Sequence, residues 1–121
     1  LKTAVLNYVR KLDLQERDRQ LADIAASFQE AVVDTLVDKT ILALQQTDVR
    51  AVCLAGGVAA NKRLRHRLRD EIERRDIPFY CPSPVLCTDN AVMIGAVGTF
   101  YLNRGVRDDF AIDVAPRLSL C

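Results

Sequence analysis

The chain has 121 residues, of which 50% are hydrophobic and 27% are charged, and its formal net charge is +1. This composition is typical of an ordinary folded domain and excludes a disordered chain. No run approaches the roughly 20 apolar residues that span a bilayer, and the first residues do not resemble a signal peptide. We therefore expect a single domain, 1–121, located in the cytoplasm without a membrane partner.

The first part of the chain, residues 1–48, is predicted to be helical. It begins without a methionine, and its apolar residues fit one helical face from Leu1 onward, so we expect it to begin in mid-structure. A polar stretch covers 13–19, and a long helix is predicted from about Gln20 to Gln45. Its apolar face is expected to comprise Leu21, Ala25, Phe28, Val32 and Leu36.

A βαβα core is predicted over residues 49–105. The apolar run 51–55 ends at two glycines, as expected of a strand that is buried on both faces of a parallel sheet. A helix over 59–75 and a second short strand over 78–81 complete a βαβ unit. The apolar seam of this helix is expected to consist of Leu64, Leu68 and Ile72.

The segment 82–88 contains two prolines and is predicted to be a loop at the exit of the second strand. The last helix is expected from about Asp89 to Arg104, capped by Thr88 or Asp89 and terminated by Gly105. The remaining residues, 106–121, form a tail. The fold class is therefore α/β, a βαβα core with additional helices.

The four cysteines show no CxxC pairing, which argues against a closed zinc site or a disulfide framework. We expect reduced and mostly buried thiols at Cys53, Cys81, Cys87 and Cys121.

The first candidate site is the turn between the first strand and the following helix. Gly56 and Gly57 allow the backbone to approach a ligand closely, and the N-terminal end of a helix favours phosphate. Asn61 adds an amide that both donates and accepts hydrogen bonds. A Gly-Gly pair after a strand is also a common tight turn, so both interpretations stay open.

The second candidate site is Asp89, at the start of the last helix. A carboxylate at this position caps a helix or offers oxygen to a metal ion. Both candidate sites follow the C-terminal ends of successive parallel strands, which is the sheet edge where α/β proteins bind ligands. Catalytic zinc usually has three protein ligands, and His66 is expected to be an exposed helix residue, so further ligands must come from outside this chain.

A basic run occupies residues 62–69. It would neutralise phosphates of a nucleic acid, or form a solvated face that nearby acidic residues balance. No aromatic residues accompany it as a stacking surface. The run consists of Lys62, Arg63, Arg65, Arg67 and Arg69.

The motifs AGGVAANKRL and PxPxLCTDNAVMIGAVG, with LKTAVL and ASFQEAVVDTLV upstream, closely resemble the C-terminal part of the TsaD/Gcp family. The family comprises tRNA N6-adenosine threonylcarbamoyltransferases, formerly labelled O-sialoglycoprotein endopeptidases. Lys2 and the CTD triplet resemble its bacterial branch. Near the tail, Leu118 stands where the family often has Trp, and Gly95 replaces a frequent Ala.

This resemblance implies the second half of an actin-like, sugar-kinase-like ATPase (ASKHA) fold. It implies transfer of threonylcarbamoyl from threonylcarbamoyl-adenylate to the adenosine next to the tRNA anticodon. By resemblance, Gly56, Gly57 and Asn61 contact the nucleotide substrate, and Asp89 ligates one divalent metal ion, iron or zinc. The implied partners are tRNA and TsaB-like and TsaE-like proteins, with no DNA.

The family's two metal-binding histidines, in an HxxxH motif, are absent from this sequence. We therefore expect the chain to be inactive by itself and to bind no metal tightly. Two alternatives stay open: a hydrogenase-maturation type of carbamoyltransferase, which shares the Gly-Gly-Val turn, and a non-catalytic nucleotide-binding platform for partner proteins.

Overall fold

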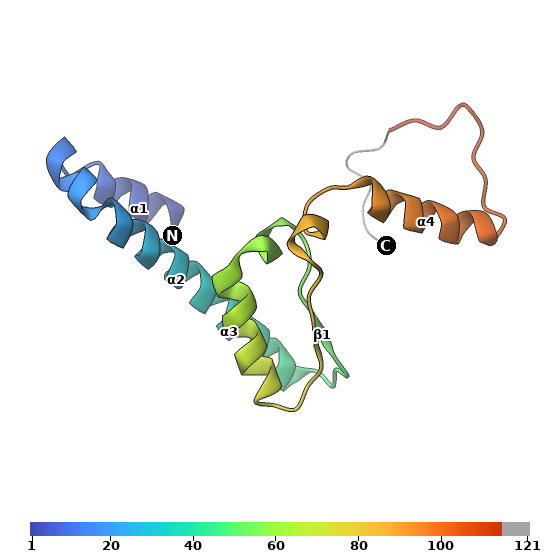
Figure 1. Cartoon of the computed structure of the whole chain (residues 1–121), viewed down its shortest axis with the longest axis horizontal. Coiled ribbons are helices and arrows are strands. Elements are labelled where there is room, and N and C mark those ends of the chain that lie inside the picture. Colours follow the sequence, from blue (N-terminus) through green and yellow to red (C-terminus); the bar gives the residue numbers. More distant parts are fainter. Residues whose placement is uncertain (115–121) are drawn as a thin grey trace. The chain divides into compact units, whose positions relative to one another are not determined.

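A computed structural model describes residues 1–114 of the chain, so Leu118 lies outside the described part. Helices and short strands alternate in the order expected of an α/β chain (Figure 1). Two compact units are present, Leu1–Thr88 and a second that begins at Asp89, and each is described by itself. The ASKHA fold and the single-domain organisation stay predictions. The elements are α1 (Lys2–Val9), α2 (Leu14–Gln46), β1 (Val52–Cys53), η1 (Gly57–Ala60), α3 (Lys62–Glu73), β2 (Phe79–Tyr80), η2 (Pro84–Leu86) and α4 (Ala91–Asn103).

Helix α2 begins earlier than the sequence analysis predicted. The polar stretch 13–19 is its first part, because the Asp13 side chain accepts a hydrogen bond from the backbone N–H of Glu16 at 2.8 Å. An acidic residue followed three positions later by glutamate is a helix-start pattern. The polar stretch is therefore the capped start of the helix.

The apolar face predicted for α2 is wrong at positions in both halves of the helix. Val33 and Val37 are the buried residues of this helix, whereas Leu21 and Leu36 are exposed. The helix carries apolar residues on more than one side. Its first half faces α1, which lies alongside it, and its second half faces α3 through a different set of positions (Figure 1).

Strands β1 and β2 pair in parallel, as predicted, with Val52 opposite Phe79 and Cys53 opposite Tyr80. They are shorter than predicted, and they are not buried on both faces. Val52 and Phe79 pack against the core, whereas Cys53 and Tyr80 are exposed. Successive strand residues point to opposite faces, and the helices cover one face of this sheet.

The core of the first unit is the contact between α2 and α3. The predicted seam of α3 is confirmed, since Leu64, Leu68 and Ile72 are all buried. They form one apolar cluster with Val33 and Val37. Partly buried side chains from both strands complete this cluster, so the seam also holds the sheet in place.

Helix α4 begins at Ala91, and its cap is Asn90 rather than the predicted Thr88 or Asp89. The Asn90 side chain accepts a hydrogen bond from the Met93 backbone N–H at 3.1 Å. Asn is among the preferred caps because its oxygen reaches the third amide of the helix.

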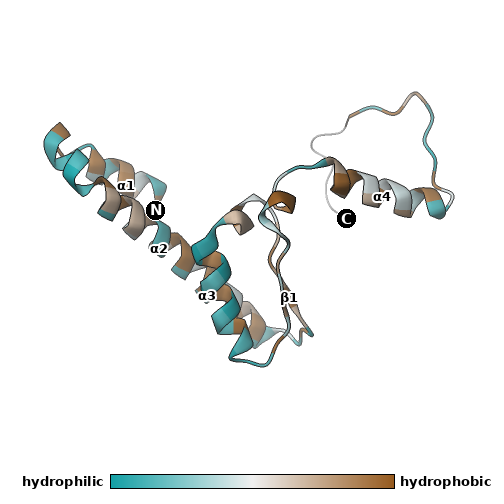
Figure 2. Cartoon of the chain, viewed as in Figure 1, coloured by the Kyte–Doolittle hydropathy of each residue, from teal (hydrophilic) through white to brown (hydrophobic). Residues whose placement is uncertain are grey.

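Gly105 terminates α4, as predicted. It has a φ of +78°, and the N–H groups of Gly105 and Val106 donate to the carbonyls of Leu102 and Tyr101. This pair of bonds is a Schellman motif. Figure 2 shows that α4 has no strongly hydrophilic side between its ends, which is typical of a helix that is buried in a larger core.

Within residues 1–114, no helix is long and apolar enough to cross a membrane. The cysteines of this part are free thiols, but the expectation that they are mostly buried is wrong. Cys87 is buried, Cys81 is half-buried and Cys53 is exposed on the uncovered face of the sheet. Cys121 lies outside the described residues.

Truncating the α2–α3 seam should destabilise the chain far more than an equivalent truncation at the surface. Leu68→Ala should lower the free energy of unfolding by about 2–5 kcal/mol, because Leu68 is 3% exposed. Leu42→Ala, a matched control at 53% exposure, should cost less than about 1 kcal/mol. Urea unfolding followed by circular dichroism measures both, and equal losses would contradict the assignment of the core.

Candidate functional site

The Gly-Gly turn follows β1 directly and is open to solvent. Gly56 has a φ of +86°, a conformation that favours glycine, and its carbonyl accepts a hydrogen bond from Ala59 N–H at 2.9 Å. Gly57 has no such backbone requirement, and a Cβ at either glycine would meet no atom within 4 Å. The backbone of this turn is thus accessible to a ligand.

Asn61 has a structural role that the sequence analysis missed. Its Oδ1 accepts a hydrogen bond from the Leu64 backbone N–H at 3.1 Å, so Asn61 is the N-cap of α3. Its Nδ2 donates to Gln29 Oε1 of α2 at 3.3 Å. An Asn between a turn and an apolar-periodic segment is itself a helix-start signal. The substrate contact stays a prediction.

Arg65 joins the Gly-Gly turn to the loop after β2, which the sequence did not predict. Its guanidinium donates to the Ala59 carbonyl, to the Pro82 carbonyl at 2.7 Å and to Cys87 Sγ at 2.8 Å. Ala59 lies in η1 and Cys87 ends η2, so the two loops at the C-terminal edge of the parallel strands are linked through one side chain.

Asp89 is exposed and is the first residue of the second unit. Because Asn90 caps α4, the Asp89 carboxylate is not the acceptor at this helix start. Its approach to Asn61 stays a prediction. His66 is exposed on α3, as expected. Over residues 1–114, the structure contains no group of three His, Cys, Asp or Glu residues that could hold a metal ion.

The basic run is divided between two faces of α3. Arg63 makes two hydrogen bonds to the Glu30 carboxylate, at 2.6 and 2.8 Å, and Arg67 lies 3.4 Å from both Glu30 and Asp34. These acids belong to α2, whereas Arg69 lies 3.9 Å from Glu73 of its own helix. The Arg63 hydrogen bond lowers the pKa of Glu30. This part of the run therefore links two helices.

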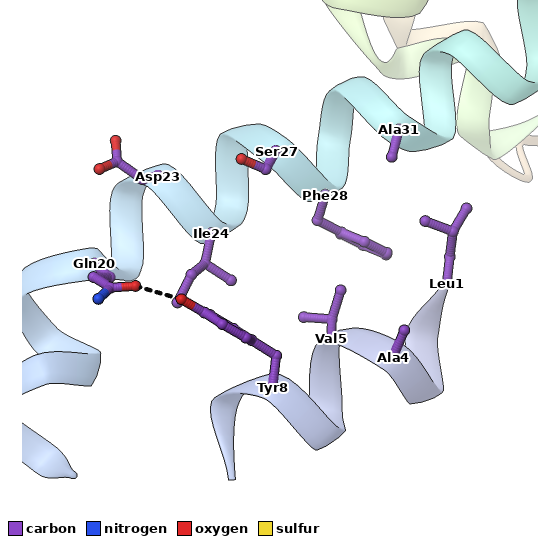
Figure 3. Close-up of a pocket in the computed structure, with 10 residues that line it drawn as sticks. All are labelled: Leu1, Ala4, Val5, Tyr8, Gln20, Asp23, Ile24, Ser27, Phe28 and Ala31. Carbon is purple, nitrogen blue, oxygen red and sulfur yellow. Dashed lines mark hydrogen bonds between the residues drawn. The ribbon is translucent and has the colours of Figure 1, made fainter. Parts of the chain in front are cut away.

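An apolar groove of about 380 Å³ lies between α1 and α2 (Figure 3). Val5 and Tyr8 of α1 face Ile24 and Phe28 of α2 across it, and Tyr8 Oη donates to Gln20 Oε1 at 2.7 Å. None of the candidate site residues lines this groove. The groove is therefore separate from the Gly-Gly turn.

A parallel βαβ unit with an open glycine turn, and with both strand-exit loops on one edge, defines the chain as an α/β protein. The model of the family described as "TsaD: tRNA N6-adenosine threonylcarbamoyltransferase" matches residues 1–96. The chain therefore belongs to this family. The match includes the Gly-Gly turn, Asn61 and Asp89.

Curated proteins named tRNA N6-adenosine threonylcarbamoyltransferase are similar to nearly the whole chain. The protein of Geobacter metallireducens is 50% identical over 113 residues, which are 93% of this chain and 33% of the relative. That of Symbiobacterium thermophilum is 50% identical over 120 residues, 99% of this chain and 35% of the relative. The chain spans about a third of the length of these relatives.

Replacing Asn61 separates its capping role from its other contacts. Asn61→Ala should lower the free energy of unfolding by about 1 kcal/mol, because the Leu64 amide loses its acceptor. Asn61→Ser keeps an oxygen at the cap and should lose only a few tenths of this amount. Chemical denaturation of both variants measures the difference, and equal stabilities would rule out the cap.

The ion pairs between α2 and α3 should contribute to acid sensitivity. Because the pKa of Glu30 is lowered on folding, the stability that this carboxylate contributes is fully present above its ordinary pKa of 4.5. It is lost as the pH falls through the lowered value. Glu30→Gln should therefore flatten the acid side of the stability profile, measured as the urea midpoint against pH. Asp38→Asn, which removes one exposed carboxylate from the same helix, is the control, and an unchanged slope in Glu30→Gln would refute the coupling.

Proposed function

We propose that this chain is a segment of an enzyme that transfers a threonylcarbamoyl group from threonylcarbamoyl-adenylate to N6 of the adenosine beside the tRNA anticodon. In this reaction the N6 amine attacks the carbamoyl carbon. A new C–N bond forms, the C–O bond to the adenylate phosphate breaks, and AMP leaves with that electron pair while N6 loses a proton. The observation that carries the proposal is the family match over residues 1–96, which includes both candidate loops.

The residues of the Gly-Gly turn suit the phosphate side of this substrate. The open backbone at Gly56 and Gly57 and the N-terminal end of α3 favour an anion. Asn61 Nδ2 lies at the same helix start, where its hydrogen bond to Gln29 is long enough for exchange with a ligand. We assign to these residues the binding and orientation of the adenylate, and most of the catalysis to electrostatic positioning.

The proposed cofactor is one divalent metal ion, iron or zinc. Asp89 fits such an ion in part, since it is an exposed carboxylate that caps no helix, and it supplies one ligand. The described residues offer no complete ligand set, so the remaining ligands would come from other parts of a longer polypeptide. When bound, the ion would orient the substrate and neutralise charge on its oxygens.

The proposed partners are tRNA, which the names of the relatives state as their substrate, and TsaB-like and TsaE-like proteins. A cytoplasmic location is part of the same proposal. The hydrogenase-maturation alternative is disfavoured, because the family model that matches is that of the tRNA-modifying enzymes.

Two substitutions in the full-length protein that carries this segment test the proposed site. Asp89→Ala should abolish metal-dependent formation of the modified adenosine, because it removes a metal ligand. Asn61→Ser keeps the cap of α3 and should lower the rate by about tenfold or more, because it removes the orienting amide. Nucleoside analysis of the tRNA and metal content by mass spectrometry are the measurements.

Asp108→Asn is the matched control, since Asp108 is an exposed carboxylate of the same unit as Asp89. It should retain wild-type activity and metal content. Unimpaired tRNA modification by Asp89→Ala would reject the ligand role, and unimpaired modification by Asn61→Ser would reject the substrate contact.

A further inference from the structure

Arg65 differs from its basic neighbours in what it contacts. Arg63 and Arg67, four residues apart, lie on the face of α3 that meets the carboxylates of α2. Arg65 lies on another face and turns toward the strand-exit loops. It is half-buried, and its three hydrogen-bond acceptors belong to two loops that lie far apart in the sequence.

The acceptors at both ends of this link are shielded from solvent. Ala59 is 0% exposed and Cys87 is 4% exposed. Hydrogen bonds in such surroundings are stronger than at an exposed surface, and their loss leaves polar groups without partners. A planar guanidinium directs several donors at fixed angles, whereas a lysine ammonium is a single point charge, so lysine cannot reproduce this link.

We propose that Arg65 is a positioning residue that fixes the spacing between the Gly-Gly turn and the loop after β2. Ala59 is two residues before Asn61. Two residues extend at most about 7 Å, so movement at Ala59 is passed to Asn61. The part of this inference that concerns catalysis rests on the proposed function.

The first test measures the link itself in the 121-residue chain, with iodoacetamide as the probe. Arg65→Lys and Arg65→Gln should each raise the alkylation rate of Cys87 by about tenfold or more, because the loop opens locally when these hydrogen bonds are lost. Cys53 is exposed and serves as the internal reference. Peptide mass spectrometry reports each thiol separately.

Arg69→Lys is the matched control on the same helix, where Arg69 lies 3.9 Å from Glu73 and is half-exposed. It should leave Cys87 as protected as in the wild type. Urea unfolding of every variant measures its global stability. If Cys87 reacted only through global unfolding, its alkylation rate would rise in proportion to the loss of global stability, whereas local opening raises the rate further. Unchanged Cys87 protection in Arg65→Gln would overturn the proposal.

The second test uses the full-length protein that carries this segment and measures tRNA modification under steady-state conditions. Arg65→Lys should lower kcat by about tenfold or more with little change in KM for tRNA, while Arg69→Lys stays at the wild-type level. Normal kcat in Arg65→Lys would overturn the positioning role. If the unsubstituted protein forms no product, the proposed function fails, and the thiol test still decides whether Arg65 holds the loops.

Discussion

The first unit depends on the apolar seam between α2 and α3. Two strands of two residues each cannot form a stable sheet alone, and here they are held because Val52 and Phe79 pack against that seam. The seam consists of side chains that are at most 3% exposed, from two helices separated along the chain. The position of α3 therefore determines where both strand-exit loops lie, and with them the candidate site.

Helix α3 performs three tasks because its faces differ. Its leucine and isoleucine face forms the core, and a second face pairs Arg63 and Arg67 with acids of α2. A third face places Arg65 beside the two strand-exit loops. The same face places Arg69 over the ring of Phe79, with 5.9 Å between the Arg69 guanidinium carbon and the ring centroid. A basic run that suggests a nucleic-acid surface is, at these positions, largely part of the internal support of the βαβ unit.

The sequence predicts regular features well where one periodicity dominates. Leu64 and Leu68 lie on a strongly amphipathic helix, so the sequence predicts which face of α3 is buried. Helix α2 carries apolar residues on several sides, and only the positions of α1 and α3 decide which of them are buried. Arg65 could not be distinguished from its neighbours, because its acceptors come from loops whose placement depends on the strand pairing.

For the candidate site, the sequence predicts the glycine turn and the open backbone, and the positive φ of Gly56 explains why a glycine is needed there. The sequence analysis assigned Asn61 to ligand binding, because its amide both donates and accepts hydrogen bonds, and did not predict that it caps α3. The pairing of Asn61 with Asp89 stays a prediction. Helix α4 is apolar around its circumference, which is typical of a helix that is buried in a larger core.

We propose that this chain supplies part of a metal and nucleotide site that it cannot complete. Calorimetric titration of the 121-residue chain with zinc or ferrous iron measures whether this is so. We expect weak binding without defined stoichiometry, because a catalytic metal needs about three protein ligands and Asp89 offers one. Tight binding of one ion per chain would contradict it.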